Sequence, residues 1–402
     1  MTERTGEDLR ALFLRHVCQT SEQPLGIVVQ RAQGATIWDI DGRAYLDLLS
    51  GMGVANIGYA HPAVLRAVAE QSHAYLHVAV YGETVQRPQV ALARQLATLA
   101  PGDLSVVYFT NSGTEAVEGA LKTARKFTAR RRLVSFTGAF HGDTFGSLSV
   151  GGNPVYQRPF GPLLSDVEQL PFGDIAALQR ITAAVAAVIV EPVQGEGGVR
   201  IPPPEFLPAL RRRCSEVGAL LIADEVITGF GRTGKHFACE HWRVVPDILV
   251  LAKALGGGLP LGAFIGRPEI MQTLAHDPPL AHVTTFGGHP LSCAAGLAAL
   301  DVLRSEDLAG RAARVGEQWL AQLQALAAGG GCRARGLGML LALEFDAPEQ
   351  TRRFVAACFA RGLILNWTLH CDTVVRLAPP LTITADEIAH ANVMIAEALA
   401  AS

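Results

Sequence analysis

Two short, unbroken runs of apolar residues in the middle of the chain each end at a single charged residue. The run 220–223 is followed by Asp224, and the run 248–252 is followed by Lys253. Continuous apolar runs of this length indicate strands that are buried on both faces of a parallel sheet. Ligands of open α/β sheets lie just beyond the carboxyl ends of such strands. We therefore expect Asp224 and Lys253 at two neighbouring strand ends, beside a binding site.

The hydrophobic pattern of the remaining chain also predicts an α/β fold. Strands are expected at 105–109, 133–136 and 186–190, a short helix at 7–18, and a hairpin at 37–47 around an Asp-Gly turn. A long helix should start near residue 290. After it, the pattern predicts helices and strands at 318–326, 339–345, 349–360, 363–365, 373–377 and 386–400.

A further helix should begin directly after Ser112, because Ser112 and Glu115 have the spacing of a capping box. It should end near residue 130. The N–H groups of Gly113 and Thr114 would then be free, and together with the positive end of the helix dipole they would form a seat for a phosphate. Taken alone, this motif fits an ordinary capped helix equally well.

One cofactor suits both charged residues at the strand ends. A buried carboxylate and a buried ammonium are costly to desolvate unless each has a partner. Pyridoxal phosphate (PLP) has a cationic ring nitrogen that Asp224 could pair with and an aldehyde that could form a Schiff base with Lys253. We therefore expect a PLP site, with Asp224 and Lys253 as its catalytic residues.

Seven motifs of this chain, in the same order, resemble the class III aminotransferases, the family of the acetylornithine and ornithine aminotransferases. The resemblance extends from about residue 34 to residue 384. The motifs are TNSGTEAVE (110–118), FHGDT (140–144), EPVQGEGGV (191–199), LLIADEVITGFGRTG (220–234), PDILVLAKALGGG (246–258), TTFGGHP (284–290) and VRLAPPL (375–381).

This resemblance implies a particular architecture, the PLP-transferase fold type I. A large domain at 51–295 would contain a mainly parallel seven-stranded sheet between helices. A small α+β domain would be built from both ends of the chain, with an N-terminal segment at 1–50 and a C-terminal part at 296–402. The family also implies a homodimer whose active sites are shared across the interface.

The same resemblance assigns cofactor contacts to individual residues. Phe140 would stack on the PLP ring, and Val226 would pack on the opposite ring face. His141 would also belong to the cofactor site, and Glu191 would lie near the ring hydroxyl and the imine. Thr285 would reach across the dimer to bind the phosphate in the other subunit.

Glu196 and Arg376 would control substrate binding. Arg376 lies on an apolar strand, where an arginine suits a carboxylate clamp better than a core position. By resemblance, Glu196 pairs with Arg376 while a substrate without an α-carboxylate is bound and releases it when glutamate binds.

Three further positions depart from the ornithine and acetylornithine enzymes or from many other relatives. Those enzymes have FHGRT, with an arginine that grips a substrate carboxylate, where this chain has Asp143. An aspartate would repel a carboxylate, and the diaminopelargonate-type members have a similar YHGDT. Met52 stands where the ornithine enzyme has a tyrosine, so Met52 is expected either to line the substrate pocket or to fill the core. Many relatives have glutamine in place of Ile227.

The sequence therefore predicts a PLP-dependent aminotransferase. It would move an amino group from a primary amine or ω-amino acid to a 2-oxo acid, in two half-reactions at Lys253. The expected 2-oxo acid is 2-oxoglutarate, and pyruvate is the second choice. Another class III activity, such as that of an aminomutase, epimerase or decarboxylase, is the alternative, because the shared motifs do not exclude it. A non-catalytic binding protein would be expected to lack Asp224 or Lys253.

Composition narrows the setting of this activity. A formal net charge of −3 gives no basic surface for nucleic acid, and no apolar run is long enough for a membrane span. The start, MTERTGEDLR, lacks the apolar core of a signal peptide. Seven cysteines without a CxxC pair fit a reducing cytoplasm.

Two other motifs resemble known sites but are not expected to function as such. The segment 229–235 fits GxxxxGK, yet a histidine follows where a nucleotide-binding loop needs Ser or Thr. His236, Cys239, Glu240 and His241 match no zinc spacing, so no metal site is expected.

Overall fold

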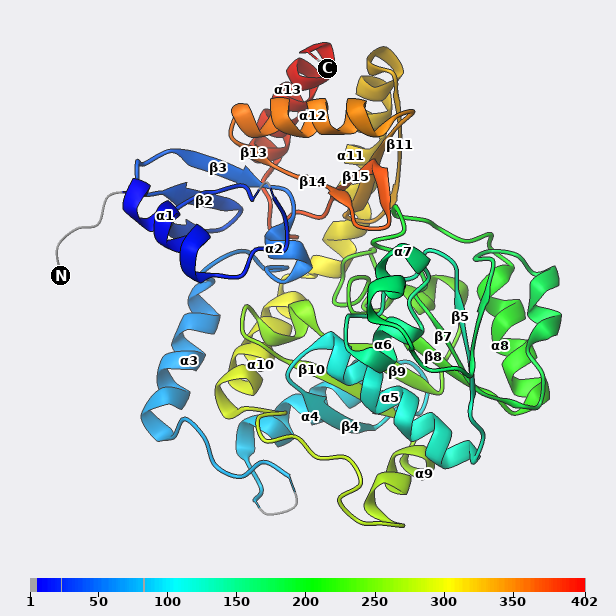
Figure 1. Ribbon diagram of the computed structural model, residues 1–402. Helices are drawn as coiled ribbons and strands as arrows, with labels where there is room; N and C mark the ends of the chain where they lie inside the picture. Colours follow the sequence, from blue (N-terminus) through cyan, green and yellow to red (C-terminus); the bar gives the residue numbers. More distant parts are fainter. Residues whose placement is uncertain (1–5, 23, 82–83, 402) are drawn as a thin grey trace.

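A seven-stranded sheet lies at the centre of the larger part of the molecule (Figure 1). The computed structural model describes residues 6–22, 24–81 and 84–401. Strand β10 runs antiparallel to both of its neighbours, and the other pairs are parallel. The expected α/β fold with a mainly parallel seven-stranded sheet is therefore confirmed. In spatial order the strands are β4 (Val106–Thr110), β10 (Gly262–Gly266), β9 (Ile248–Leu251), β8 (Leu220–Asp224), β7 (Val185–Val190), β5 (Arg132–Phe136) and β6 (Val167–Leu170).

Helices cover both faces of this sheet, which explains why its central strands are apolar throughout. In β7, all of whose residues are buried, Ile189 packs with helix α5 (Gly113–Thr128) on one face. The adjacent Val188 packs with helix α8 (Phe206–Val217) on the other face. Side chains alternate along a strand, so a sheet between two helical layers must bury every position.

Strands β8 and β9 place the two charged residues at one edge of the sheet. They pair in parallel with Asp224 opposite Val250, so Lys253, shortly after the end of β9, lies at the same edge. The expectation of two neighbouring strand ends is confirmed. The antiparallel β10 was missed. A Cβ on its first residue, Gly262, would lie 2.1 Å from the Ser112 carbonyl oxygen, so this strand approaches the start of α5 closely.

Both ends of the chain build the smaller part of the molecule. Strands β1 (Val29–Gln33), β2 (Thr36–Asp39) and β3 (Ala44–Asp47) form an antiparallel sheet, which confirms the expected hairpin. The C-terminal strand β13 (Leu363–Ile364) joins this sheet in parallel with β3.

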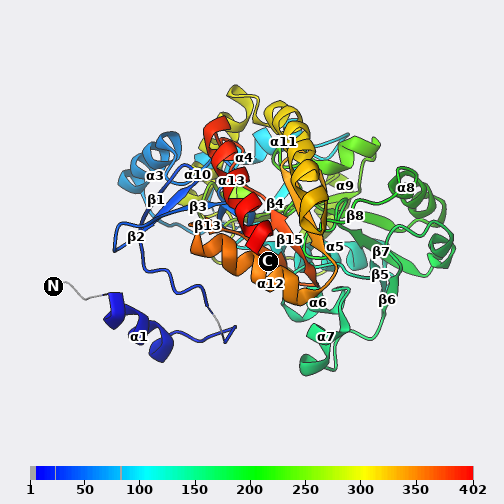
Figure 2. The ribbon, with the colours of Figure 1, turned by 90° about the horizontal axis from the view of Figure 1, so that it is seen from above.

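A second antiparallel sheet belongs entirely to the C-terminal part. Its order is β11 (Cys332–Leu337), β12 (Leu340–Phe345), β15 (Cys371–Leu377) and β14 (Asn366–Thr368). Helices α11 (Leu308–Gly330), α12 (Pro348–Ala360) and α13 (Ala385–Ala401) pack around it and cover the top of the molecule (Figure 2).

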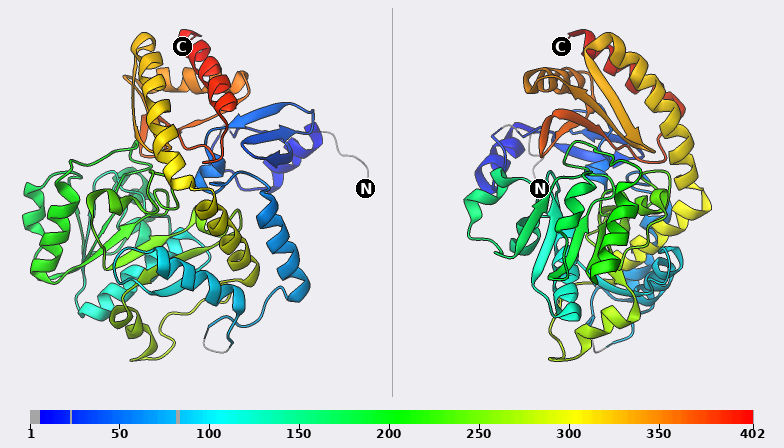
Figure 3. Two further views of the ribbon diagram at one scale, coloured as in Figure 1. Left: turned by 180° about the vertical axis from the view of Figure 1, so that it is seen from behind. Right: turned by 90° about the vertical axis from the view of Figure 1, so that its right-hand side faces the viewer.

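Helix α10 (Pro290–Ser305) connects the two parts, and α11 continues upward from it (Figure 3). Helix α10 packs against α3 (Pro62–Ala74) and α4 (Arg87–Leu99). The expected domain boundary at residue 295 falls inside α10. The division into 1–50, 51–295 and 296–402 stays a prediction.

Several expected bounds differ from those in the structure. Helix α11 begins at Leu308 rather than at residue 318, because the Asp307 carboxylate caps it by accepting a hydrogen bond from Gly310 N at 3.2 Å.

The remaining elements are short. They are α1 (Gly6–His16), α2 (Ser50–Gly53), α6 (Phe145–Ser149), α7 (Pro154–Gln157), α9 (Pro268–Met271) and the 3₁₀ turns η1 (Arg158–Phe160), η2 (Ala176–Arg180), η3 (Ala238–Trp242), η4 (Lys253–Gly256) and η5 (Gln272–Ala275).

Candidate active site

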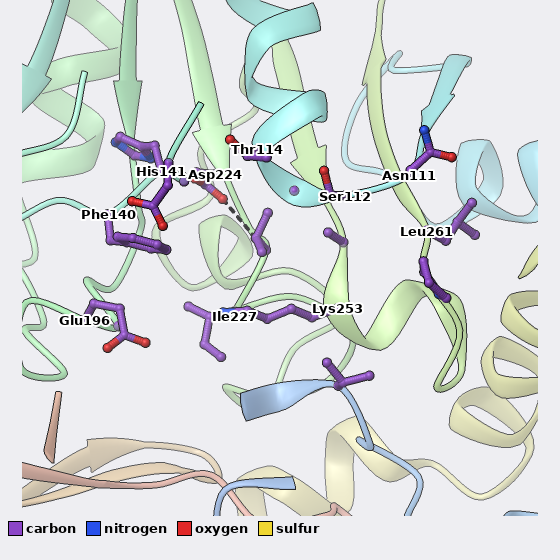
Figure 4. A pocket seen from close by; sticks show the side chains of 18 of the residues that line it. Asn111, Ser112, Thr114, Phe140, His141, Glu196, Asp224, Ile227, Lys253 and Leu261 are labelled. Atoms are coloured by element: carbon purple, nitrogen blue, oxygen red, sulfur yellow. Dashed lines mark hydrogen bonds and ion pairs between the residues drawn. The ribbon is translucent and has the colours of Figure 1, made fainter. Parts of the chain in front are cut away.

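A cavity of about 720 Å³ lies at the edge of the sheet where β8 and β9 end (Figure 4). Every residue expected at the site lines it, except Met52 and Thr285. The expected residues brought together here are Ser112, Gly113, Thr114, Phe140, His141, Asp143, Glu191, Glu196, Asp224, Val226, Lys253 and Arg376. Asn111, Val54 and the apolar residues 259–261 also line the cavity, and sequence reasoning missed them.

Asp224 has a partner that the sequence did not reveal. Its Oδ2 lies 2.7 Å from His141 Nδ1, and its Oδ1 accepts a hydrogen bond from Val226 N at 3.1 Å. His141 Nε2 is buried and has no hydrogen-bond partner among the described residues. Asp224 and His141 are far apart in the sequence, so no local pattern could have identified this pair.

Lys253 has a strained backbone and faces the cavity. Its φ is 49°, in the left-handed region that L-residues adopt at a cost of about 1 kcal/mol or more, mainly at functional sites. The side chain extends toward Ile227 (Figure 4). Burial, assisted by the charge of Arg376, lowers the pKa of Lys253, and nearby carboxylates oppose this effect. A lowered pKa makes the neutral, nucleophilic amine more accessible.

Helix α5 begins directly after Ser112, as expected, and the phosphate seat at its start stays a prediction. Ser112 is the N-cap, and its Oγ accepts a hydrogen bond from Glu115 N at 3.3 Å. The second half of the capping box differs, because the Glu115 carboxylate accepts from Asn111 N rather than from Ser112 N. A Cβ on Gly113 would lie 3.2–3.3 Å from Val226 and Ala252 atoms, so a glycine keeps the helix end open toward the cavity.

The loop that carries Phe140 and His141 needs its glycine. Gly142 adopts a φ of 115°, and a Cβ there would lie 2.4 Å from Thr114 Oγ1. The Thr114 hydroxyl in turn lies 2.7 Å from Ser147 Oγ. These contacts fix the loop against the first turn of α5.

Glu191 follows β7 and is held by two backbone donors. Its Oε1 accepts from Phe140 N at 3.0 Å, and its Oε2 accepts from Gly195 N at 2.9 Å. Burial raises the pKa of Glu191 to about 7, with His141 opposing the rise and Asp224 adding to it. This carboxyl can therefore hold or release a proton near neutral pH.

Glu196 and Arg376 form a buried ion pair, which we call the gate pair. Arg376 Nη1 donates to Glu196 Oε1 at 2.5 Å, and the two side chains are only 3% and 12% exposed. Although burial alone would raise the pKa of Glu196, the charge of Arg376 brings it below its usual value. Arg376 comes from β15, so the smaller part of the molecule completes the cavity.

Asp143 is exposed and lines the same cavity. No hydrogen bond or ion pair joins it to another residue in the described part of the chain. Ile227 is buried in the cavity wall, and Cβ atoms on Gly53 and Gly195 would lie 2.5 Å and 2.9 Å from its side chain. The wall beside Ile227 is therefore apolar and tightly packed.

Met52 and Thr285 lie away from this cavity within one chain. Met52 is 46% exposed and lines a separate cavity beside α1, while Val54 of the same loop lines the cavity around Lys253. Thr285 is exposed at the surface. The roles expected for both residues stay predictions.

The cavity fits PLP. It provides a carboxylate for a cationic ring nitrogen, a lysine for an aldehyde, and a helix N-terminus for a phosphate. Since Asp224 already pairs with His141, its charge is stabilised before any ring nitrogen is present. Fold and site together are those of a PLP-dependent enzyme of fold type I.

The described residues contain no group of three His, Cys, Asp or Glu that could hold a metal ion. Cys239 is buried, and its N–H donates to Glu225 at 2.7 Å, while His241 Nε2 lies 3.0 Å from the Thr233 carbonyl oxygen. In the ranges that the structure describes, no helix is both long and apolar enough to cross a membrane.

Comparison with known proteins identifies the family. The family model of class III aminotransferases matches residues 17–399, nearly the whole chain. The chain belongs to this family, as its motifs had indicated. It is a PLP-dependent transaminase.

Three similar proteins illustrate the range of the family. A putrescine aminotransferase of Pectobacterium atrosepticum is 46% identical over 380 residues, which cover 90% of this chain and 80% of that protein. An acetylornithine aminotransferase of Methanopyrus kandleri is 44% identical over 402 residues, covering 98% and 100% of the two chains. The solved structure of ornithine aminotransferase from Toxoplasma gondii, with PLP partially occupying its active site, has a TM-score of 0.91 and 33% identity, and the match covers 99% of this chain and 95% of that one.

Proposed function

We propose that this transaminase exchanges amino groups between a primary amine, such as a diamine or ω-amino acid, and a 2-oxo acid bound through Arg376. The buried gate pair beside Lys253 carries this proposal. An arginine that can either bind a substrate carboxylate or be neutralised by Glu196 suits an enzyme whose two substrates differ in where their carboxylate lies. While an amine without an α-carboxylate is bound, Glu196 keeps its ion pair with Arg376. When an α-amino acid or a 2-oxo acid is bound, the substrate carboxylate replaces Glu196 on Arg376.

The residues around Lys253 have the following roles in this proposal. Bound PLP supplies an electron sink for the substrate carbon that loses a proton. Asp224, oriented by His141 and Val226 N, keeps a proton on the ring nitrogen. Lys253, as the neutral amine, would take the proton from the reacting carbon of the substrate and pass it to the cofactor, and it would carry a proton the opposite way in the reverse half-reaction.

The remaining cofactor contacts are assigned from their place in the cavity. The N–H groups of Gly113 and Thr114, beside Ser112, would bind the phosphate. Phe140 and Val226 would pack on the ring, and both line the cavity. Glu191, with its raised pKa, would exchange a proton near the ring hydroxyl.

Asp143 indicates the chemistry of the amine. An exposed carboxylate without a partner among the described residues attracts a second ammonium group and repels a second carboxylate. The relative that is named putrescine aminotransferase supports a diamine donor of this kind. On the acceptor side, Asp143 opposes the distal carboxylate of 2-oxoglutarate, so pyruvate, the second choice from the sequence, becomes the stronger candidate.

We further propose that the enzyme is a homodimer in the cytoplasm. Thr285 is exposed on the single chain and is free to contact a second copy. All seven cysteines are unpaired, which suits a reducing compartment.

A half-reaction assay tests the proposed function. The yellow holoenzyme is mixed with single amino donors (putrescine, ornithine, N-acetylornithine, glutamate and alanine), and the loss of the yellow absorbance is followed. Putrescine and at least one α-amino acid should convert the enzyme, and Lys253→Ala should abolish conversion. If no donor converts an enzyme that visibly binds PLP, the aminomutase or epimerase alternative is favoured.

Substitution of Asp143 separates the donors. Asp143→Arg should lower kcat/KM for putrescine about tenfold and raise it for glutamate, since one charge contact near a substrate group is worth about 1–2 kcal/mol. Asp143→Asn is the matched control, because it removes the negative charge and keeps the size of the side chain. Equal effects of Asp143→Arg on both donors would contradict this role.

A further inference from the structure

The gate carboxylate has a second partner in addition to Arg376. Glu196 Oε2 accepts a hydrogen bond from Leu369 N at 2.8 Å, while Oε1 accepts from Arg376. Leu369 and His370 form the turn between β14 and β15, and Arg376 lies on β15. Each oxygen of the carboxylate therefore has its own donor, and both donors come from one hairpin of the smaller part.

This β14–β15 turn is fixed by contacts that do not involve Arg376. Tyr156 donates its hydroxyl to Leu369 O at 2.8 Å, and His370 N donates to Glu196 O at 3.0 Å. The His370 ring stacks on Tyr156 with centroids 5.0 Å apart and meets Phe140 edge-on at 5.7 Å. The donor at Leu369 is thus held in place by helix α7 and by the loop that carries Glu196.

A fixed N–H donor changes how readily Glu196 leaves Arg376. Hydrogen bonds to a carboxylate are stronger than those between neutral groups, and the pair here is largely removed from water. An α-carboxylate that displaces Glu196 from Arg376 must overcome this second contact as well. The contribution of the turn would therefore appear in the competition between the two substrates.

We propose that Leu369 is a positioning residue whose backbone N–H holds Glu196 against Arg376 and thereby sets the balance between amine and amino-acid substrates. This inference depends on the proposed gate function of Glu196 and Arg376. The side chain of Leu369 is 42% exposed and takes no part in the contact, so the backbone group alone is responsible.

Leu369→Pro removes this N–H donor and places the ring Cδ where the hydrogen pointed at Glu196 Oε2, so both changes push the carboxylate away from the turn. Leu369 does not have a positive φ, it occupies the first position of a two-residue turn, and Thr368 before it lies in a strand. Proline is favoured at that position of a turn, and the residue before it should be extended. Leu369→Ala is the matched control, because it shortens the side chain and keeps the N–H.

The experiment compares two half-reactions of the same holoenzyme, one with putrescine and one with alanine. Leu369→Pro should raise the ratio of kcat/KM for alanine to that for putrescine about tenfold or more, the size expected for one lost hydrogen bond to a charged group. Leu369→Ala should leave the ratio within about twofold of the original enzyme. A merely structural loss would lower both half-reactions together and leave the ratio unchanged.

Binding provides a second readout without turnover. The amino acid 2-methylalanine has an α-carboxylate but no hydrogen on its α-carbon, and its dissociation constant can be measured by calorimetry. Leu369→Pro should tighten this binding, and Leu369→Ala should not. If Leu369→Pro folds poorly, Tyr156→Phe, which frees the carbonyl of Leu369, should shift both readouts in the same direction by a smaller factor.

Glu196→Ala distinguishes failure of this inference from failure of the proposed function. If Glu196→Ala leaves both the ratio and the binding of 2-methylalanine unchanged, the gate itself is wrong. If Glu196→Ala shifts both and Leu369→Pro shifts neither, the gate stands and the role of Leu369 is overturned. An equal shift in Leu369→Pro and Leu369→Ala would also overturn it, because the N–H would not be the cause.

Discussion

The Asp224 carboxylate is held in place by other groups of the chain. Both carboxylate oxygens have partners, His141 on one side and Val226 N on the other. Such supporting contacts fix a catalytic group in one orientation, which is how protein sites stabilise charge without reorganising during the reaction.

Asp224→Asn tests this arrangement. The amide keeps the size of the side chain but has no negative charge to favour a protonated ring nitrogen. We expect kcat to fall at least about a hundredfold, as on removal of other preorganised charge contacts, with a smaller loss of PLP affinity. Stopped-flow half-reactions and PLP titration measure the two quantities. Unchanged turnover would contradict the role of Asp224.

Because the pKa of Glu191 is raised, the stability of the cofactor-free chain should depend on pH. Its pKa rises from 4.5 to about 7 on folding, so the folded chain binds this proton more tightly than the unfolded chain. The stabilisation is complete below pH 4.5 and is lost as pH rises through about 7. The loss should be about 3 kcal/mol.

Urea unfolding of the cofactor-free protein and of Glu191→Gln, at several pH values from about 5 to 8, measures this effect. The unfolding free energy of the unsubstituted chain should fall relative to that of the variant as pH increases. Glu225, whose pKa burial also raises to about 7, is present in both proteins and cancels. Parallel curves would contradict the raised pKa of Glu191.

At the scale of elements, Arg232 joins segments that are distant in the sequence. It is fully buried and donates to Asn56 Oδ1 at 2.5 Å, to Pro379 O at 2.6 Å and to Met339 O at 3.1 Å. Burial lowers the pKa of Arg232 to about 9, and the charge of Arg376 adds to this effect. This arginine therefore connects the loop after β8 with the loop after α2 and with the end of the C-terminal sheet where β12 begins and β15 ends.

Arg232→Met should destabilise the protein by about 2–4 kcal/mol, because it leaves four acceptors, these three and Ser50 Oγ, without their donor. The urea midpoint measures the change. Arg212→Met on the exposed side of α8 is the control and should change stability by less than about 0.5 kcal/mol. A similar small change in Arg232→Met would mean that water replaces the guanidinium.

At the scale of the whole molecule, the proposed homodimer is tested at the expected site residues that lie outside the cavity. Met52 and Thr285 are both exposed on the single chain. Helix α1 also presents apolar side chains to solvent, among them Leu14 at 58% and Phe13 at 39% exposure. A second copy would bury such groups, as is usual for symmetric oligomers.

Light scattering should give a mass of twice 42.7 kDa for the holoenzyme. Thr285→Asp should weaken PLP binding about tenfold or more without dissociating the dimer, because it places a negative charge beside the phosphate of the partner site. Thr285→Ser is the control. A monomer, or unchanged PLP affinity in Thr285→Asp, would contradict the shared site.

The sequence alone determined the features that depend on local pattern. Buried strands before Asp224 and Lys253 follow from unbroken apolar runs, since a sheet covered on both faces has no polar side. The start of α5 follows from Ser112, because a side-chain oxygen must satisfy the free N–H groups there. The class of chemistry followed from these positions together with the family motifs.

Only the tertiary structure decided the contacts between distant segments. The pairing of His141 with Asp224, the acceptors around Arg232 and the bond from Leu369 N to Glu196 each join residues far apart in the chain. The antiparallel course of β10 is of the same kind. Hydrophobic periodicity reports which side of an element is buried, whereas the partner of a buried polar group is fixed by how whole elements pack.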